Sequence, residues 1–540
     1  MTSPSKDPLT LDTSNYLSGW RLHIVIACLF LGSFLTALDS NIINVALPQI
    51  STDFKALGDV AWYGTAYLLT ITAFQPVYGS MYRYYRTDVV YRLSIAIFEI
   101  GSILCAAAPN SNTFIVGRAI AGLGAAGILQ GALSIISQVV PLQKRPLYMG
   151  IVISVFVIAV SVGPILGGVF TEHVTWRWCF WINVPIGVVV LVALTIFLKV
   201  QMTQSEDRAL PLRTKLYNMD FLGCLVFIGS VTTLLLALHW AGQTKPWNSS
   251  DVIGCLVGAG LLGILFVYLQ WKRGSTALIP LRVLKTRSVW TGSMVLFFLG
   301  AGTYLINFFL PFWFQGVKSI SPIQTGINFL PYLLPQLISL VIIGGIVKHF
   351  GYYVPYMVAG ELICVAGQAL LTQIHPNSTT LYWAASLVVS GLGSGMAMQL
   401  PYTAIALVLP DHDIPVGNAI AVLSYQLGGA VFISVGQNIV ITTVLDLVQQ
   451  RLPGISAEMV LSAGAANLAT LANNADELKI LRDIWNTAIA HTMILGTALA
   501  GATLPFTVGM DWLNAKRVAA ERTKGMDVEI KDEDKQPTGD

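Results

Sequence analysis

Apolar runs of roughly 20 residues recur along most of this sequence, and each is long enough to cross a hydrocarbon core about 30 Å thick as an α-helix. A helix satisfies its own backbone hydrogen bonds, so it can lie in lipid where no water is present. Only 11% of the residues are charged, whereas a soluble domain carries about 25%. The sequence therefore predicts an all-α, polytopic membrane protein.

About fourteen apolar runs are bounded by charged or turn-forming residues. We expect membrane-spanning helices near residues 22–44, 60–82, 89–108, 114–139, 147–170, 180–200, 220–240, 252–271, 290–315, 324–347, 354–372, 381–408, 416–445 and 487–510. The first 20 residues lack the basic start, short apolar core and cleavage site of a removable signal peptide. We therefore expect the first span to remain as an anchor.

The distribution of Lys and Arg indicates how the spans are oriented. With the N-terminus inside, 23 of the 31 basic residues fall on the cytoplasmic side and seven outside, and only Arg118 lies within the membrane. This excess of positive charge predicts that both termini are cytoplasmic. Asn248 and Asn377 each begin an N-x-[ST] sequon in a loop that this orientation makes external, so both are candidate N-glycosylation sites.

The longest polar connections divide the chain into blocks. We expect a cytoplasmic tail at 1–21, a six-helix bundle at 22–200, cytoplasmic loops with two extra central helices at 201–289, a second six-helix bundle at 290–510 that includes an external segment at 446–486, and a cytoplasmic tail at 511–540.

The remaining composition argues against several other classes of protein. The six cysteines are scattered singly, mostly in apolar runs, and predict neither a disulfide framework nor a metal site. The sequence has no basic patch interleaved with aromatic residues of the kind that binds nucleic acid. Its seven histidines are dispersed, without a nucleophile and base in a recognisable arrangement. We therefore expect no enzyme activity, no cofactor and no nucleic-acid partner.

A carboxylate interrupts the first apolar run at Asp39. Polar residues spaced by three or four positions share one face of this helix beside it: Ser33, Thr36, Ser40 and Asn44. A charged side chain near the centre of a lipid-facing helix costs about 2.5–3.5 kcal/mol. We therefore expect this face to point into the protein interior or an aqueous cavity, and the first span to line water.

Arg118 is the second intramembrane charge of interest. It lies near the outer end of the fourth span, at a depth similar to that of Asp39, so the two side chains are predicted to pair. A carboxylate whose solvation and partner change with conformation also changes its proton affinity. The pair is thus a candidate for coupling a proton gradient to another movement, with a static structural pair as the alternative.

Other polar or aromatic residues inside the spans need partners away from lipid. The candidates for lining a substrate cavity are Gln75, Gln130, Tyr304, Asn307, Tyr332, Gln336, Gln399, Tyr402, Tyr425 and Gln426. Each has an alternative interpretation as a packing residue. A cavity of aromatic faces and a few amides, with little charge, would suit a bulky, mostly apolar organic compound.

Four short motifs occur in order along the N-terminal half. They are Leu38-Asp39 followed by Asn44-Val45-Ala46-Leu47-Pro48; Arg118 followed by Gly122 and Gly124; Gly163-Pro164-x-x-Gly167-Gly168; and the run from Trp176 to Gly187, which reads W-R-W-C-F-W-I-N-V-P-I-G. With these motifs on spans 1, 4, 5 and 6, the chain resembles the major facilitator superfamily, in particular its fourteen-span drug:proton antiporter branch and the fungal toxin and multidrug efflux pumps within it.

The resemblance implies two six-helix bundles that rock about a central cavity, with Arg118 beside a proton-sensitive Asp39. It also implies that Gly163, Pro164, Gly167 and Gly168 form the antiporter motif, which resists leak. One loop departs from the family pattern, because Arg83 stands where the family has an acid between spans 2 and 3. Whether this loop still latches the two halves is left open.

These observations favour a proton-coupled secondary transporter that exports lipophilic small molecules such as drugs, toxins or secondary metabolites by alternating access. An importer of a nutrient or siderophore-iron chelate on the same fold is one alternative, and a membrane receptor or sensor without net transport is another. We expect a monomer in the plasma membrane, with the vacuolar membrane as the alternative. Its partners are expected to be a small-molecule substrate, protons and the lipid bilayer.

Overall fold

The computed structural model describes residues 19–54, 56, 59–198, 211, 214–215, 220–241, 245–320, 322–452, 459–460, 468–472, 474–518 and 520. Most of both predicted tails and most of the loop 201–219 lie outside these residues.

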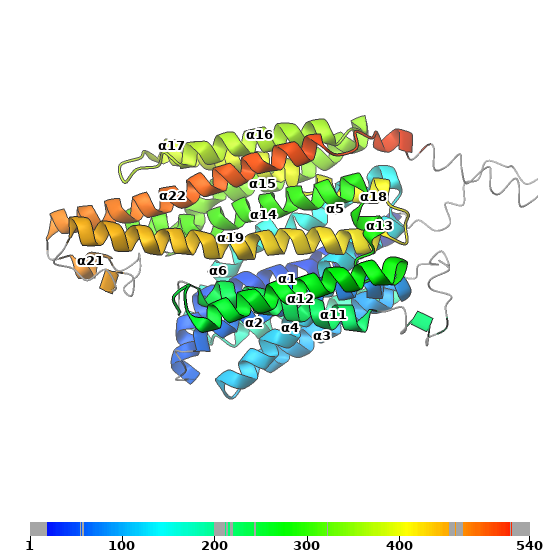
Figure 1. Cartoon of the computed structure of the whole chain (residues 1–540), viewed down its shortest axis with the longest axis horizontal. Coiled ribbons are helices and arrows are strands. Elements are labelled where there is room, and N and C mark those ends of the chain that lie inside the picture. The colour runs from blue at the N-terminus through cyan, green and yellow to red at the C-terminus, as the bar shows by residue number, and fades with distance from the viewer. Residues whose placement is uncertain are drawn as a thin grey trace, which may run out of the picture.

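The described part of the chain is built from helices (Figure 1). The N-terminal block contains α1 (Gly19–Phe54), α2 (Val60–Tyr84), α3 (Thr87–Ala106), α4 (Ser111–Val139), α5 (Arg145–Ile153), α6 (Val155–His173), α7 (Trp178–Trp181) and α8 (Asn183–Phe197). Two helices follow, α11 (Phe221–Trp240) and α12 (Ser250–Arg273). The C-terminal block contains α13 (Leu281–Leu284), α14 (Arg287–Phe312), α15 (Pro322–Phe350), α16 (Val354–Leu371), α17 (Thr380–Met398), α18 (Leu400–Val408), α19 (Ile414–Arg451), α21 (Leu468–Leu471) and α22 (Ala475–Val508).

Thirteen helical segments among the described residues are long and apolar enough to cross a membrane. The helix α2 is not one of them because tyrosines, Gln75 and Arg83 make it more polar, but its 25 residues give it the required length. Counting α2, each of the fourteen predicted spans coincides with a helix. Spans 5, 6 and 12 each consist of two consecutive helices.

The helices pack as two six-helix bundles. The first runs from α1 to α8 and the second from α14 to α22, and they meet where α2 packs against α19 and where α15 packs against α5 and α6. Within each bundle, glycines allow close backbone contact. A Cβ atom at Gly124 of α4 would lie 2.3 Å from the backbone N of Phe98 on α3, and one at Gly393 of α17 would lie 2.1 Å from the backbone N of Cys364 on α16.

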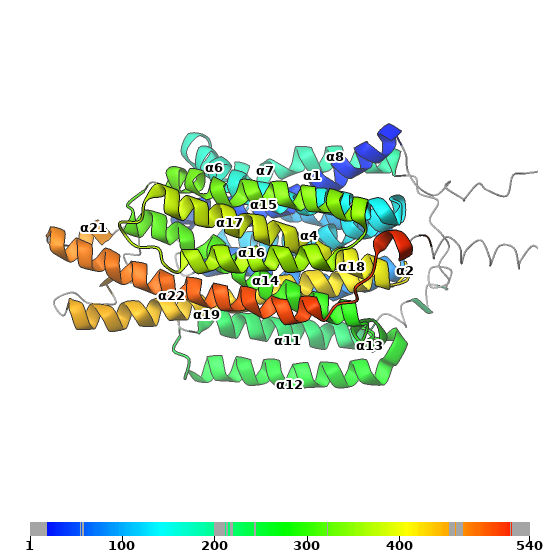
Figure 2. The same cartoon turned by 90° about the horizontal axis from the view of Figure 1, so that it is seen from above.

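The two extra helices are central in the sequence but peripheral in space. Figure 2 shows α11 and α12 along one edge of the molecule. The helix α11 packs against α2 and α19, whereas α12 packs mainly against α11. Much of the apolar surface of α12 is exposed, including Leu261, Ile264 and Val267, as expected for a helix that faces lipid.

The helices run lengthwise between two ends, which we call the Gly19 end and the Phe54 end after the limits of α1. The last described helical residues, 515–518 and 520, lie at the Gly19 end with the start of α1 (Figures 1 and 2). At the Phe54 end, α19 and α22 project beyond the other helices (Figure 1). Asn248 and Asn377 are exposed in loops at this same end.

Candidate functional site

Asp39 and Arg118 form an ion pair inside the N-terminal bundle. Both are fully buried, with 0% and 1% of their surfaces exposed. The Arg118 Nη1 atom donates a hydrogen bond to Asp39 Oδ2 at 2.5 Å and so joins α4 to α1. The predicted pairing is therefore confirmed. The expectation that the first span lines water is wrong at Asp39 in this conformation, because this side chain has no exposed surface.

The guanidinium group of Arg118 is held on several sides. Its Nε atom donates to the backbone carbonyl of Tyr63 at 2.9 Å. The group lies 4.4 Å from the centre of the Tyr67 ring and 5.8 Å from that of Phe180, distances at which aromatic rings attract a cation. The Tyr67 hydroxyl donates to the backbone carbonyl of Thr36 at 3.1 Å, one turn before Asp39. The packing fixes Arg118 between two rings.

The second oxygen of the carboxylate, Asp39 Oδ1, is buried without a hydrogen-bond partner. Removing two opposite charges from water costs several kcal/mol per ion, and the attraction between them repays this only with good geometry. A proton added at Oδ1 would neutralise Asp39 and weaken its attraction for Arg118. Protonation at Oδ1 would thus convert a tight ion pair into a looser neutral contact.

Three polar side chains of α1 donate hydrogen bonds within the helix, whereas Ser33 Oγ is buried without a hydrogen-bond partner. Thr36 Oγ1 donates to the Ser33 carbonyl, Ser40 Oγ donates to the Thr36 carbonyl, and Asn41 Nδ2 donates to the Ala37 carbonyl, at 2.7–2.9 Å. These residues therefore do not form a polar chain leading away from Asp39. The side chain of Asn44 lies outside the described residues.

The glycines of the antiporter motif pack against α1 next to Asp39. A Cβ atom at Gly163 would lie 2.8 Å from Asn41 Cβ, and one at Gly167 would lie 2.5 Å from the Ile42 carbonyl oxygen. Gly168 is half-buried, and the side chain of Pro164 is not described. The motif thus brings α6 into backbone contact with the helix that carries the acid.

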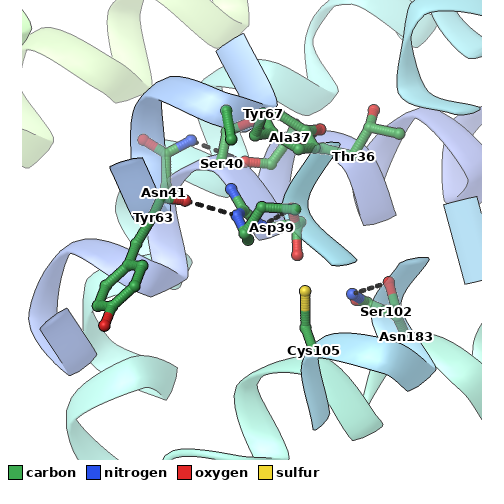
Figure 3. A network of polar contacts seen from close by, with 12 residues as sticks. Thr36, Ala37, Asp39, Ser40, Asn41, Tyr63, Tyr67, Ser102, Cys105 and Asn183 are labelled. Atoms are coloured by element: carbon green, nitrogen blue, oxygen red, sulfur yellow. Dashed lines mark hydrogen bonds and ion pairs between the residues drawn. The ribbon is translucent and has the colours of Figure 1, made fainter. Parts of the chain in front are cut away.

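The sequence did not single out Asn183, although the motif from Trp176 to Gly187 contains it. Asn183 is fully buried at the start of α8 and donates to Ser102 Oγ on α3 at 3.2 Å. It also lies within interaction range of the Asp39 carboxylate (Figure 3). One turn before Ser102, Glu99 has both carboxyl oxygens buried without a hydrogen-bond partner. The asparagine therefore connects α8 and α3 beside the ion pair.

Some of the predicted cavity residues come together in the C-terminal bundle. Tyr304 donates to Gln426 Oε1 at 2.8 Å, and its ring centre lies 5.8 Å from that of Tyr425. Tyr332 and Tyr402 lie close enough to Tyr425 to interact electrostatically. Tyr304 also lies within such range of Tyr67, the ring beneath Arg118. The hydrogen bond and the ring contact thus bring Tyr304, Tyr425 and Gln426 together between α14 and α19.

The other predicted cavity residues lie elsewhere. Gln130 Nε2 donates to the Gln75 carbonyl at 3.1 Å, and Gln399 lies between α5 and α15. Gln336 packs its backbone against α17. Several amides have a buried atom without a hydrogen-bond partner, a property that suits groups meant for a ligand: Gln75, Gln130, Asn307 and Gln399.

Ion pairs join the two bundles at the Gly19 end. Arg83 at the end of α2 lies 3.9 Å from Asp413, which precedes α19, and Arg145 of α5 lies 3.7 Å from Asp411. Arg282 of α13 donates two hydrogen bonds to Asp413, one of them at 2.8 Å. In this conformation the loop between spans 2 and 3 is thus in contact with the other bundle through Arg83. The cation lies in the N-terminal bundle and the acid in the C-terminal bundle.

In the part of the chain that the structure describes, no three His, Cys, Asp or Glu residues lie close enough together to hold a metal ion. All six cysteines are free thiols.

Two six-helix bundles, joined by ion pairs at one end and enclosing a buried charge pair, define a polytopic membrane transporter. The chain belongs to the Major Facilitator Superfamily, whose family model matches residues 29–433. This membership agrees with the resemblance seen in the sequence motifs and places the chain among transporters, not enzymes.

Similar proteins include several efflux pumps. The chain is 38% identical over 505 residues to the MFS-type efflux pump MFS1 of Arthroderma benhamiae, which covers 94% of each chain. It is 37% identical over 515 residues to the MFS-type transporter astH of Aspergillus oryzae, covering 95% of this chain and 91% of that one. The human organic anion transporter MFSD10 (TETRAN) has the same fold, with a TM-score of 0.57 and 14% identity over 89% of this chain and 100% of that one.

Proposed function

We propose that this protein is a proton-coupled exporter of lipophilic small molecules. The observation that carries the proposal is the fully buried Asp39–Arg118 pair, in which one carboxylate oxygen has no partner. Ionisable residues inside a membrane are costly, and where they persist they usually serve a transport or proton pathway. The names of the similar proteins, which include efflux pumps, support export over import.

In the proposed cycle, Asp39 accepts a proton in the outward-open state and releases it in the inward-open state. Protonation frees Arg118 from its counter-ion, which favours rearrangement of α1 against α4. Substrate and proton need not touch, because each needs only to favour a different conformation of the bundles. Binding sites near the midplane of two rocking repeats are typical of secondary transporters.

The tyrosines and amides described above are the proposed contacts for the substrate. Tyr304, Tyr425 and Gln426 offer aromatic faces and one amide with little charge. Such a surface suits a bulky, mostly apolar organic compound with a few hydrogen-bonding groups.

We further propose that the Gly19 end faces the cytoplasm, which follows the excess of Lys and Arg in the loops at that end. Asn248 and Asn377 are then external and available for N-glycosylation. The ion pairs of Arg83 and Arg145 close the cytoplasmic side in the described conformation. The proposed location is the plasma membrane, with the vacuolar membrane as the alternative, and the proposed active form is a monomer.

Replacement of Asp39 by asparagine tests the proposal. Cells that lack their own efflux pumps would express either form and be loaded with a panel of neutral lipophilic fluorescent dyes, Nile red among them. The Asp39→Asn variant should reach the surface at the normal level but lose export driven by the proton gradient. Asp483→Asn is the matched control, because Asp483 pairs with Arg451 on the exposed surface. Normal export by Asp39→Asn would defeat the proposal.

A further inference from the structure

The motif from Trp176 to Gly187 contributes two rings to a cluster above the ion pair, and the proposed transport cycle gives this cluster no role. The five rings are Phe54, Tyr63, Phe114, Trp176 and Phe180. Phe114 lies at the centre, 5.0–6.0 Å from each of the other four ring centres, mostly in edge-to-face contacts. Four of the rings are buried and only Phe54 is partly exposed. We call them the aromatic plug.

The aromatic plug lies between the Phe54 end and the ion pair. Phe54 ends α1, Tyr63 and Phe114 lie in the first turns of α2 and α4, and Trp176 lies in the turn before α7. Phe114 comes one helical turn before Arg118, and Phe180 lies 5.8 Å from the Arg118 guanidinium. Along α1 and α4, the plug therefore lies between the Phe54 end and the ion pair.

The outer rim of the plug is polar, whereas its centre is apolar. Trp176 Nε1 donates to Asp53 Oδ2 at 2.7 Å. The Tyr63 hydroxyl donates to Ser111 Oγ at 2.9 Å, and that hydroxyl donates to Asp59 Oδ2 at 2.5 Å. Two acids at the rim can attract protons and water, whereas the packed rings of Phe114 and Phe180 carry no hydrogen-bonding group. A closely packed aromatic core of this kind excludes water.

The plug belongs to one bundle alone. All five rings lie on α1, α2, α4, α7 and the turn before α7. Rocking of two rigid bundles would leave the distances among these rings unchanged. A local movement of the Trp176–Phe180 segment is then needed to admit a proton, and this segment is held to α1 through the hydrogen bond to Asp53.

A second ring, that of Tyr67, also lies against the guanidinium. Tyr67 lies 4.4 Å from it and interacts with Tyr304 of the C-terminal bundle. A proton therefore has two possible routes to Asp39. One passes through the plug, and the other passes Tyr67 along the proposed substrate path. The polar rim at Asp53 and Asp59 favours the route through the plug.

We propose that the aromatic plug is the outer gate for protons, separate from the substrate path, and that the Trp176–Phe180 segment is its moving part. This inference rests on the proposed role of Asp39. When the segment moves, a proton passes from external water to Asp39 Oδ1, the O–H bond forms there, and the ion pair with Arg118 is lost. When it is closed, Asp39 exchanges no protons with the outside.

Proton leak in the absence of substrate tests the gate. Purified full-length protein would be reconstituted in liposomes that contain a pH-sensitive dye, and an inward proton gradient would be imposed. Phe180→Ser replaces a ring beside Arg118 with a hydroxyl that can bind water, so influx should rise several-fold. Phe180→Leu keeps the apolar seal and should match the wild-type protein. Trp176→Ala opens the rim beside Asp53, so proton influx should also rise in this second variant.

Two further variants identify the origin of any leak. Adding Asp39→Asn to Phe180→Ser should return influx to the wild-type level, because the leak requires a proton acceptor at Asp39. Phe314→Ser removes an equally buried ring that contacts Trp383 in the C-terminal bundle, and it should cause no leak that depends on Asp39.

Three results would overturn the gate. The first is proton influx at the wild-type rate in both Phe180→Ser and Trp176→Ala. The second is a leak in Phe180→Ser that persists when Asp39→Asn is added. The third is an Asp39-dependent leak that appears in Tyr67→Ala but not in the plug variants. The proposed function fails separately, if Asp39→Asn alone keeps normal gradient-driven export. Loss of export in Asp39→Asn together with tight plug variants would refute the gate alone.

Discussion

At the scale of single residues, two opposite charges lie inside an apolar bundle, and the arginine has more stabilising contacts than the aspartate. Arg118 has a carboxylate, a backbone carbonyl and two rings around it. Asp39 has Arg118 on one oxygen and no hydrogen-bond partner on the other. Because of this asymmetry, we expect the acid to be the member of the pair that gains or loses a proton.

Removing the cation alone should be worse than removing both charges. Arg118→Gln leaves Asp39 buried without its counter-ion, a change that costs about 3–5 kcal/mol in comparable buried pairs. The double variant Asp39→Asn/Arg118→Gln contains no buried charge at this site and should recover much of the lost thermal stability. Thermal unfolding of the detergent-purified proteins measures both. Equal destabilisation by the single and double variants would show that the pair is not coupled.

Glu99 offers a contrast with Asp39. Both of its carboxyl oxygens are buried without a hydrogen-bond partner, and a charged group in that state is far more costly than a neutral one. The neutral isostere should therefore fit, so Glu99→Gln is expected to keep wild-type stability and gradient-driven dye export. Loss of coupling in Glu99→Gln, at a normal surface level, would extend the proton pathway beyond Asp39.

At the scale of helices, glycines set the spacing in the same way in both bundles. Gly124 places α4 against the α3 backbone, and Gly393 places α17 against the α16 backbone. The sequence showed these glycines as scattered small residues, and their spacing alone did not identify the partner helix. By contrast, four glycines on α12, at positions 254, 258, 260 and 263, have open space or only one loose contact around them.

This difference predicts opposite outcomes for the same substitution. Gly124→Ala forces a methyl group to within 2.3 Å of a backbone atom, and overpacking of this kind costs about 1–3 kcal/mol. Gly258→Ala on α12 meets no atom within 4 Å and should leave stability unchanged. The melting temperatures of the two purified variants provide the comparison. A lower melting temperature for Gly258→Ala than for Gly124→Ala would refute the packing described here.

At the scale of the whole molecule, the two bundles are held together at the Gly19 end by basic residues of the N-terminal bundle and acids of the C-terminal bundle. Asp413 is almost completely buried between Arg83 and Arg282. Arg282 belongs to the short helix α13 that follows α12. The short helix that follows the two extra helices therefore helps to hold Asp413 in place, although the extra helices themselves lie at the edge of the molecule.

Weakening this closure should shift the balance of conformations. Arg83→Gln removes one charge from the contact with Asp413, while Arg282 stays beside that acid. Spin labels at the Gly19 ends of α2 and α19 should then report a larger population with the bundles apart. Lys245→Gln is the matched control, since Lys245 pairs with Asp251 within one connection at the other end. An unchanged distance distribution for Arg83→Gln would argue against a latch at this position.

Sequence alone predicted the fold and the central pair because both follow from strong local rules. Apolar runs located the spans, and two charges at similar depth indicated that Asp39 and Arg118 meet. Sequence could not place Asn183 beside Asp39, or Arg83 against Asp413, because neither contact joins two opposite charges inside predicted spans: Asn183 is uncharged and Asp413 lies in a loop. The cavity residues were chosen by type and scattered over several contacts for the same reason.

Proton movement during transport is the most direct test of the central claim, that Asp39 carries the coupled proton. Purified protein in liposomes with an internal pH-sensitive dye would be given the neutral compound that the wild-type protein exports in cells. The wild-type protein should move protons in the direction opposite to the compound, and Asp39→Asn should bind the compound yet move no protons. Proton counterflow by Asp39→Asn at the wild-type rate would contradict the account.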